Sequence, residues 1–354
     1  MGSISRYLLK KAADGLKDQQ RLKIEMSNSK KLPECFHFNR ERRMPVVQIS
    51  SEDGFFIFPS QQSFEYFEKS KKDSYELRPD AIGIPLFQMI SCITPFCKTG
   101  RHDKKVSYVP YYKIFKFVLR TADEPPPYAV TKAVASNNGL VLYKEPIYDI
   151  YENCGRTDIK YEFEGAMSTE PNSLTMAHRD GYRDLDTKVN GLNLRWHVTY
   201  SPVITNDHYK LTLLENYEVN RLDEDVVKIS KNRMTFDRQR QKDERFVAAH
   251  YTREFVTSLF RRVSQEGHLI LGEHCTDQGS FGLNNIPLLT EELACQGLLI
   301  HYIEYMKRKR KDRLARERRP QNGMNLANQM NMIIFQTNMN TNMNMNMNMN
   351  MNMM

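Results

Sequence analysis

One segment near the C-terminus constrains the fold most: a predicted helix over 291–306 that is apolar nearly all the way around. Thr290 provides a capping hydroxyl, and Glu291 and Glu292 place acids in the first turn, where they favour a helix start. The residues that make the circumference of this helix apolar are Leu293, Ala294, Gly297, Leu298, Ile300, His301, Tyr302 and Tyr305. A helix without a polar face is expected to be buried on every side. The rest of the chain therefore has to surround it.

A series of short strand-like segments precedes the helix. Segments 159–165 and 192–200 alternate apolar and polar residues with the two-residue period of a half-buried strand. Segment 246–263 has spacings that fit a helix, but 247–251 and 267–272 could equally be two strands. We expect strands at these two places and leave the residues between them open. The other predicted strands are 55–58, 113–120, 128–134, 139–144, 147–151, 209–219 and 226–230. Short strands at this spacing, separated by turn residues, predict an antiparallel sandwich or barrel.

Two arrangements would bury such a helix. An open sheet with the helix on one face should leave it a polar stripe, but only Gln296, His301 and Glu304 are available for one. A closed barrel has no exposed sheet edges, and a helix inside it must be apolar all round. The small residues Ala294 and Gly297 would also let strands approach closely. We therefore predict an α+β fold, mainly an antiparallel β-barrel wrapped around a C-terminal hydrophobic helix.

This order of elements resembles the tubby-like superfamily, which includes the LURP-one-related proteins and the phospholipid scramblases. The similarity lies in 127–132, in the strand pair 247–251 and 267–271, and in the helix itself. The resemblance implies a closed barrel around a hydrophobic helix. Tubby-like proteins often bind phosphoinositides through basic residues on the barrel. The positions that do so have no residue-by-residue equivalents here.

Composition divides the chain into four parts. Residues 1–105 are charged and irregular in pattern, and 106–306 form the predicted barrel domain, closed by helix 291–306. Residues 307–319 are a basic stretch that we expect to continue that helix. The tail, 320–354, becomes a Met-Asn repeat that cannot build a core, so we expect it to be disordered.

Sequence motifs for catalysis are missing. The phosphate-binding loop, the dinucleotide-binding glycine motif, the Gly-x-Ser-x-Gly elbow and His-Glu-x-x-His do not occur. Asp180, Asp184 and Asp186 are dense enough for a cation, but neighbouring basic residues favour a hydrated hairpin loop. His197, beside Trp196, is better explained as a structural histidine. We expect no catalytic residue, no metal and no cofactor, and hence a non-enzymatic protein.

The net charge is concentrated in one place. The chain carries +8, and residues 307–319 alone contribute +7, so the remainder is nearly neutral. The basic residues of this stretch, which we call the basic run, are Lys307, Arg308, Lys309, Arg310, Lys311, Arg313, Arg316, Arg318 and Arg319. Such a run fits contact with an anionic membrane surface, recognition by a nuclear-import receptor, or phosphate contacts to nucleic acid without base specificity. A solvated helix extension is the alternative without a function.

Cellular location follows from weaker signals. The six cysteines are scattered, which favours reduced thiols, and no secretory signal is visible. The most apolar stretch, 293–306, is shorter than the roughly 20 residues of a membrane span. We therefore expect an intracellular binding or adaptor protein, cytoplasmic or nuclear, peripheral at a phosphoinositide membrane. The alternative is a nuclear regulator whose basic run is an import signal.

Overall fold

The computed structural model describes residues 32–70, 76–92, 109–155, 158–166, 174–179, 183–199, 208–214, 220–223, 246–254, 262–274, 283 and 286–316. Its elements are η1 (Glu34–Phe36), β1 (Arg40–Ile49), β2 (Phe55–Ile57), α2 (Gln61–Lys69), β3 (Phe87–Ser91), β4 (Tyr112–Thr121), β5 (Lys132–Ala135), β6 (Leu140–Cys154), β7 (Asp158–Gly165), β8 (Leu174–Arg179), β9 (Leu185–Val189), β10 (Leu192–Thr199), β11 (His208–Leu213), β12 (Val247–Arg253) and β13 (Val263–Glu273). A long helix over 288–316 follows; residues to His301 belong to one compact unit and those from Tyr302 to a second.

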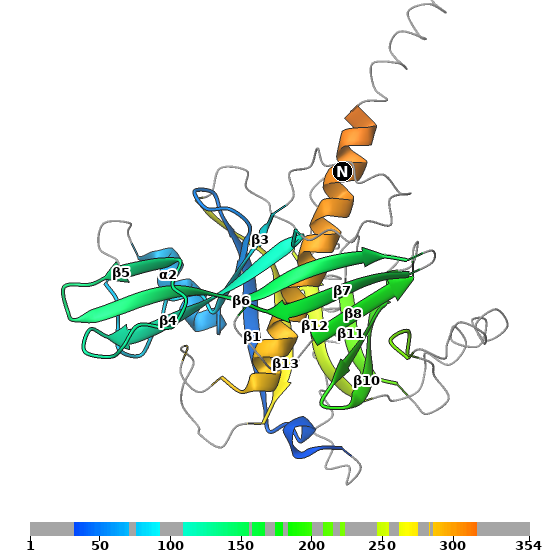
Figure 1. The fold of residues 1–354 in the computed structure, drawn as a ribbon, viewed down its shortest axis with the longest axis horizontal. Helices are drawn as coiled ribbons and strands as arrows, with labels where there is room; N and C mark the ends of the chain where they lie inside the picture. The colour runs from blue at the N-terminus through cyan, green and yellow to red at the C-terminus, as the bar shows by residue number, and fades with distance from the viewer. Residues whose placement is uncertain are drawn as a thin grey trace, which may run out of the picture. The chain divides into compact units, whose positions relative to one another are not determined.

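The strands of the first unit form a closed antiparallel barrel. Neighbouring strands pair in the order β4-β3-β2-β1-β13-β12-β11-β10-β9-β8-β7-β6, and a further pairing of β4 with β6 closes the ring of twelve. β5 lies outside the ring and pairs with β6. The predicted barrel is therefore confirmed (Figure 1).

The first part of the long helix, 288–301, lies inside this barrel. Leu293, Leu298 and Ile300 have no exposed surface. Contacts reach strands on different sides of the ring. The ring of His301 lies 4.3 Å from that of Phe55 on β2, and Gln296 Oε1 lies 2.8 Å from Trp196 Nε1 on β10, five strands further around the ring. The helix is thus surrounded, as its apolar circumference predicted.

Polar residues of the buried helix form hydrogen bonds with the barrel wall. Trp196 Nε1 on β10 donates to Gln296 Oε1 at 2.8 Å, and Gln296 Nε2 donates to Thr187 Oγ1 on β9 at 3.2 Å. Tyr251 on β12 shares a 2.6 Å hydrogen bond with His301 Nδ1. Gln296 and His301, the candidates for a polar stripe, are instead the residues that fix the helix to particular strands.

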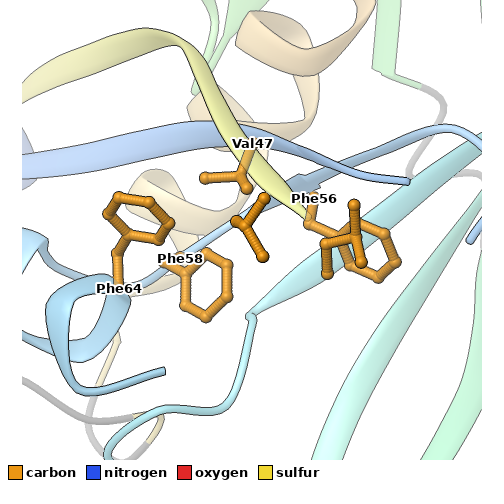
Figure 2. Packing of buried hydrophobic residues seen from close by; sticks show 6 residues of the cluster. Val47, Phe56, Phe58 and Phe64 are labelled. Carbon is orange, nitrogen blue, oxygen red and sulfur yellow. The ribbon is translucent and has the colours of Figure 1, made fainter. Parts of the chain in front are cut away.

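A second apolar cluster lies on the outer face of the barrel. Phe56 on β2 and Val47 on β1 pack there against Phe58 and Phe64, and Phe64 comes from α2 (Figure 2). Ser60 caps this helix, because its side chain accepts from the backbone N–H of Ser63 at 3.1 Å. Both faces of β1 and β2 are therefore covered, which explains the unbroken apolar runs in their sequences.

The predicted boundary of the barrel domain at residue 106 is wrong. β1, β2 and β3 all come from the first 105 residues, and β1 forms a ten-residue ladder with β13. This N-terminal part is thus not simply irregular. The strand predicted over 55–58 is confirmed as β2, but β1 and β3 were missed, because β3 is short and β1 contains a proline beside a bulge.

Other sequence predictions differ in detail. Segments 139–144 and 147–151 are one strand, β6, in which a register shift opposite Ile114 and Phe115 accommodates Pro146. The strand expected over 128–134 is shorter and begins at Lys132. Segment 226–230 and the tail 320–354 lie outside the described residues.

Gly297 provides a test of the close packing between helix and barrel. A Cβ added there would lie 2.9 Å from Leu269 Cδ2 on β13. We expect Gly297→Val to lower the free energy of unfolding by about 1–3 kcal/mol through overpacking, although valine has the better intrinsic helix propensity. Urea denaturation would measure it. Ala315→Val, at an exposed position of the same helix, is the control and should change stability by less than about 0.5 kcal/mol. A free energy of unfolding that Gly297→Val leaves unchanged would contradict close packing between the helix and the barrel.

Candidate functional site

The candidate site is the basic run, and the structure describes seven of its nine basic residues. Lys307, Arg308, Lys309, Arg310, Lys311, Arg313 and Arg316 lie on the helix, whereas Arg318 and Arg319 lie outside the described residues. The prediction that the helix continues into the run is confirmed as far as residue 316. Every residue from Lys309 to Arg316 is exposed to solvent.

A helix distributes these charges around its axis instead of gathering them on one side. At about 100° per residue, Lys307 and Lys311 fall on one side, while Lys309, Arg313 and Arg316 fall on the opposite side. Arg308 and Arg310 lie between them. The ten residues 307–316 span ~15 Å and carry a net charge of +6, since Asp312 is the only acid among them.

Two basic residues at the start of the run contact side chains of the preceding helical turn. Lys307 Nζ lies 3.2 Å from Glu304 Oε1, three residues earlier. Lys309 Nζ lies 5.6 Å from the ring centroid of Tyr305, a cation–π contact with the i,i+4 spacing of a helix. This pair was not predicted, although its spacing is visible in the sequence. The positive run thus starts beside an aromatic ring and becomes progressively more exposed.

The run has no apolar face. Leu314, 44% exposed, and Ala315 are its only apolar residues. Membrane-inserting helices need an apolar side, so this helix is suited to electrostatic contact with phosphates and not to insertion. Like charges at i,i+4, such as Lys307 with Lys311 and Lys309 with Arg313, repel each other. A bound polyanion would relieve that repulsion.

The aspartate cluster has a structural role at Asp186, and the hydrated-loop interpretation is wrong for that residue. Asp186 lies on β9 with no exposed surface. Its carboxylate accepts from Arg195 Nη2 at 3.0 Å and from the Arg221 backbone N–H at 2.9 Å and Nη1 at 3.2 Å. Two guanidinium groups therefore occupy the oxygens that a cation would need. Asp180 lies outside the described residues.

His197 is held in place by the carboxylate of Asp184. Its Nδ1 lies 3.3 Å from Asp184 Oδ2, and the Val198 backbone N–H donates to Asp184 Oδ1 at 3.0 Å. Asp184 is partly desolvated, which by itself raises the pKa of its carboxyl, but the hydrogen bonds from His197 and Val198 outweigh this and leave that pKa lowered. Trp196, the neighbouring residue, is the one that faces the helix.

A cavity of about 210 Å³ lies beside the N-terminal end of the buried helix. Its lining includes Cys35, Asn190, His274 and Leu288. The buried Glu273 carboxylate on its wall already accepts from Arg42 Nε at 2.9 Å and from Thr290 Oγ1 at 3.1 Å. The volume is below that of typical small-molecule pockets, ~300–1,000 Å³. The basic run remains the stronger candidate.

Neither a metal site nor a membrane-spanning helix is found in the part of the chain that the structure describes. No three His, Cys, Asp or Glu side chains there are placed to hold a metal ion. None of the helices described there is long and apolar enough to cross a membrane. Among the described cysteines, burial raises the pKa of the Cys295 thiol well above its usual value, which disfavours the reactive thiolate.

Comparison with known proteins places the fold in a family. The sequence profile of the DIA1 family matches residues 39–309, which include all the barrel strands and the buried helix. The chain belongs to the DIA1 family. It is 73% identical over 332 residues to protein DIA1 of Saccharomyces cerevisiae, covering 94% of this chain and 98% of that protein.

More distant DIA1-family relatives come from the same yeast. The uncharacterized protein YOR385W is 33% identical over 297 residues, 84% of this chain and 97% of the relative. The uncharacterized protein YNL165W is 26% identical over 303 residues, 77% of this chain and 72% of the relative. No solved structure matches this chain. The resemblance to tubby-like proteins stays a prediction.

The ion-pair cluster around Asp186 generates a prediction on stability. Asp186→Asn leaves the buried Arg195 without its charge partner, so we expect a loss of about 3–5 kcal/mol in the free energy of unfolding. Asp223→Asn is the matched control: that carboxylate pairs with Lys188 at 2.6 Å but is 41% exposed, so its loss should cost at most ~1 kcal/mol. Thermal and urea unfolding would measure both. Equal costs would contradict a structural role specific to Asp186.

Proposed function

We propose that this protein is a non-enzymatic binding or adaptor protein that contacts an anionic membrane surface through its basic run. The observation that carries the proposal is the concentration of charge: +6 on ten helical residues, against a chain total of +8. A surface rich in phosphate is the partner that such a segment would recognise, and phosphoinositide headgroups are the densest source of phosphate on a membrane. The resemblance to tubby-like proteins supports the same partner.

Energetics make this contact sufficient for reversible binding. A basic residue near an anionic leaflet contributes ~1 kcal/mol. Because the charges surround the helix, about half of the seven described basic side chains face a flat membrane at once. That gives ~3–4 kcal/mol, before any contribution from Arg318 and Arg319. Binding of this strength is reversible and sensitive to salt.

The barrel supports a binding role more than a catalytic one. Its interior is filled by helix residues such as Leu293, Leu298 and Ile300, each with no exposed surface. The polar groups that lie inside, Gln296 and His301, are engaged with Trp196 and Tyr251. The barrel would then enclose and stabilise the helix segment that precedes the basic run in the sequence.

Liposome co-sedimentation tests the proposal. The wild-type chain should bind vesicles containing phosphatidylserine or phosphoinositide and leave phosphatidylcholine vesicles unbound. Changing Lys307, Arg308, Lys309, Arg310 and Lys311 to Gln should lower the partition coefficient about 100-fold, because two to three of these charges face the membrane at once. Raising the salt concentration should release the wild type. Comparing phosphatidylserine vesicles with phosphoinositide vesicles of the same surface charge separates general electrostatic binding from a preference for phosphoinositide.

The control for this experiment removes the same total charge from the part of the chain that precedes the basic run. Five partly exposed basic side chains there are each ion-paired with an acid, and all would be changed to Gln: Arg43, Lys69, Arg78, Lys113 and Lys188. We expect this variant to bind as the wild type does. Equal weakening by both variants, or no binding of the wild type to anionic vesicles, would contradict the proposal.

A nuclear role is the second candidate, because the run is also as short and dense in Lys and Arg as an import signal. Imaging of a fluorescent fusion with and without residues 307–319 separates the two. Nuclear accumulation that is lost on deletion, combined with no liposome binding, would favour a nuclear regulator, in which the run could also contact nucleic acid. Membrane association that is lost on deletion favours the first candidate.

A further inference from the structure

The strand β5 leaves one edge of the sheet open. β6 pairs along one side with β4, from residue 140 to residue 150, and on its other side with β7 from residue 148 onward. β5 occupies that second side only at residues 141–144, beyond the closed ring (Figure 1). All four residues of β5 are exposed. Among the residues that the structure describes, no strand pairs with its outer edge, so this edge is available for another strand. Most proteins protect such an edge.

The direction of the backbone groups on this edge follows from one hydrogen bond. Ser136 N donates to Leu140 O at 2.8 Å, which makes Ser136 and Leu140 a hydrogen-bonded pair. In an antiparallel ladder such pairs alternate with non-hydrogen-bonded ones. Val134 and Lys132 therefore direct their backbone groups toward β6. Ala133 and Ala135 direct theirs outward, where small side chains leave the edge accessible.

Exposed apolar side chains gather on the same segment. Among the residues that the structure describes, six large apolar side chains are exposed, and three of them are Tyr128, Val130 and Val134. Tyr128 is 96% exposed and follows three prolines, 125–127. Tyrosines that project in this way are common anchors of protein interfaces. An apolar group beside an open edge indicates an interaction surface.

The edge is complementary to itself. We propose that two copies of this chain associate by antiparallel pairing of β5 with β5 of the second copy, centred on Val134. In that register Ala133 pairs with Ala135 of the other copy, and Ala135 with its Ala133. Both residues direct their backbone groups outward, so the two pairs make four backbone hydrogen bonds. Lys132 then lies opposite Ser136 of the second copy, and the two lysines do not face each other.

The same register continues an apolar row across the sheet. Leu119 on β4 pairs with Leu142 on β6, and Leu142 pairs with Val134 on β5. Residues directly opposite one another share a face of the sheet, so these three side chains form a row. Both leucines pack against a buried cluster that includes Leu77 and Ile84. With Val134 at the two-fold axis, the row continues through the Val134 of the second copy.

Sedimentation velocity over a concentration series tests this dimer, and Val134 provides the sharpest variants. Wild type should show a concentration-dependent dimer. Val134→Lys and Val134→Glu should each be monomeric, because like charges would face each other across the axis. An equimolar mixture of the two variants should recover a dimer. That recovery requires residue 134 to face residue 134, so it tests the register as well as the surface.

Two controls keep the result interpretable. Val109→Lys adds the same charge to an exposed valine outside the segment 128–136 and should leave the dimer intact. At a concentration at which the wild type is monomeric, the Val134 variants should unfold close to the wild-type temperature, since the side chain is 46% exposed. A wild type that stays monomeric at every concentration, a Val134→Lys variant that still dimerises, or a mixture that stays monomeric would each overturn the proposal. Liposome binding by the basic run is a separate readout, so either proposal can fail alone.

Discussion

The fold depends on the fit between one helix and the barrel that encloses it. The helix contributes the side chains that fill the lumen, and the wall contributes partners for the helix's polar groups. The chain of hydrogen bonds from Trp196 to Gln296 to Thr187 joins the helix to two neighbouring strands, β10 and β9. An unpaired buried amide costs about 1–3 kcal/mol, so these bonds act against rotation or sliding of the helix. Apolar packing alone, which has no direction, would permit both.

The extent to which the fold could be predicted from the sequence differs between parts of the chain. The barrel and its buried helix followed from the helix's apolar circumference and from strands such as 159–165, where the two-residue period is plain. Of the three N-terminal strands, β2 was predicted from its apolar run over 55–58, whereas β1 and β3 were not, because β1 is covered on both faces and lacks alternation. Covering by α2 is a tertiary effect that no local pattern reports. The same holds for Asp186, whose partner Arg221 lies 35 residues further along the chain.

The basic run was predictable in position but not in geometry. Its residues and net charge are visible in the sequence. Their distribution around the axis follows only once the segment is known to be helical, and it changes the expected mode of contact. A helix with one basic face would lie flat on a membrane with most of its charges engaged. A helix charged all round engages about half, whichever way it is turned. It therefore binds more weakly and with less dependence on orientation.

Closure of the barrel and the open edge at β5 have a common origin in the length of β6. This strand has 15 residues, more than any other described here, and its ladder with β4 extends past the region where β7 pairs with it. The closing ladder thus continues beyond the ring, and β5 covers part of the side that β7 leaves unpaired. A closed barrel has no edge to offer. Because β6 is longer than closure requires, the fold regains one edge, and Val134 lies at its centre.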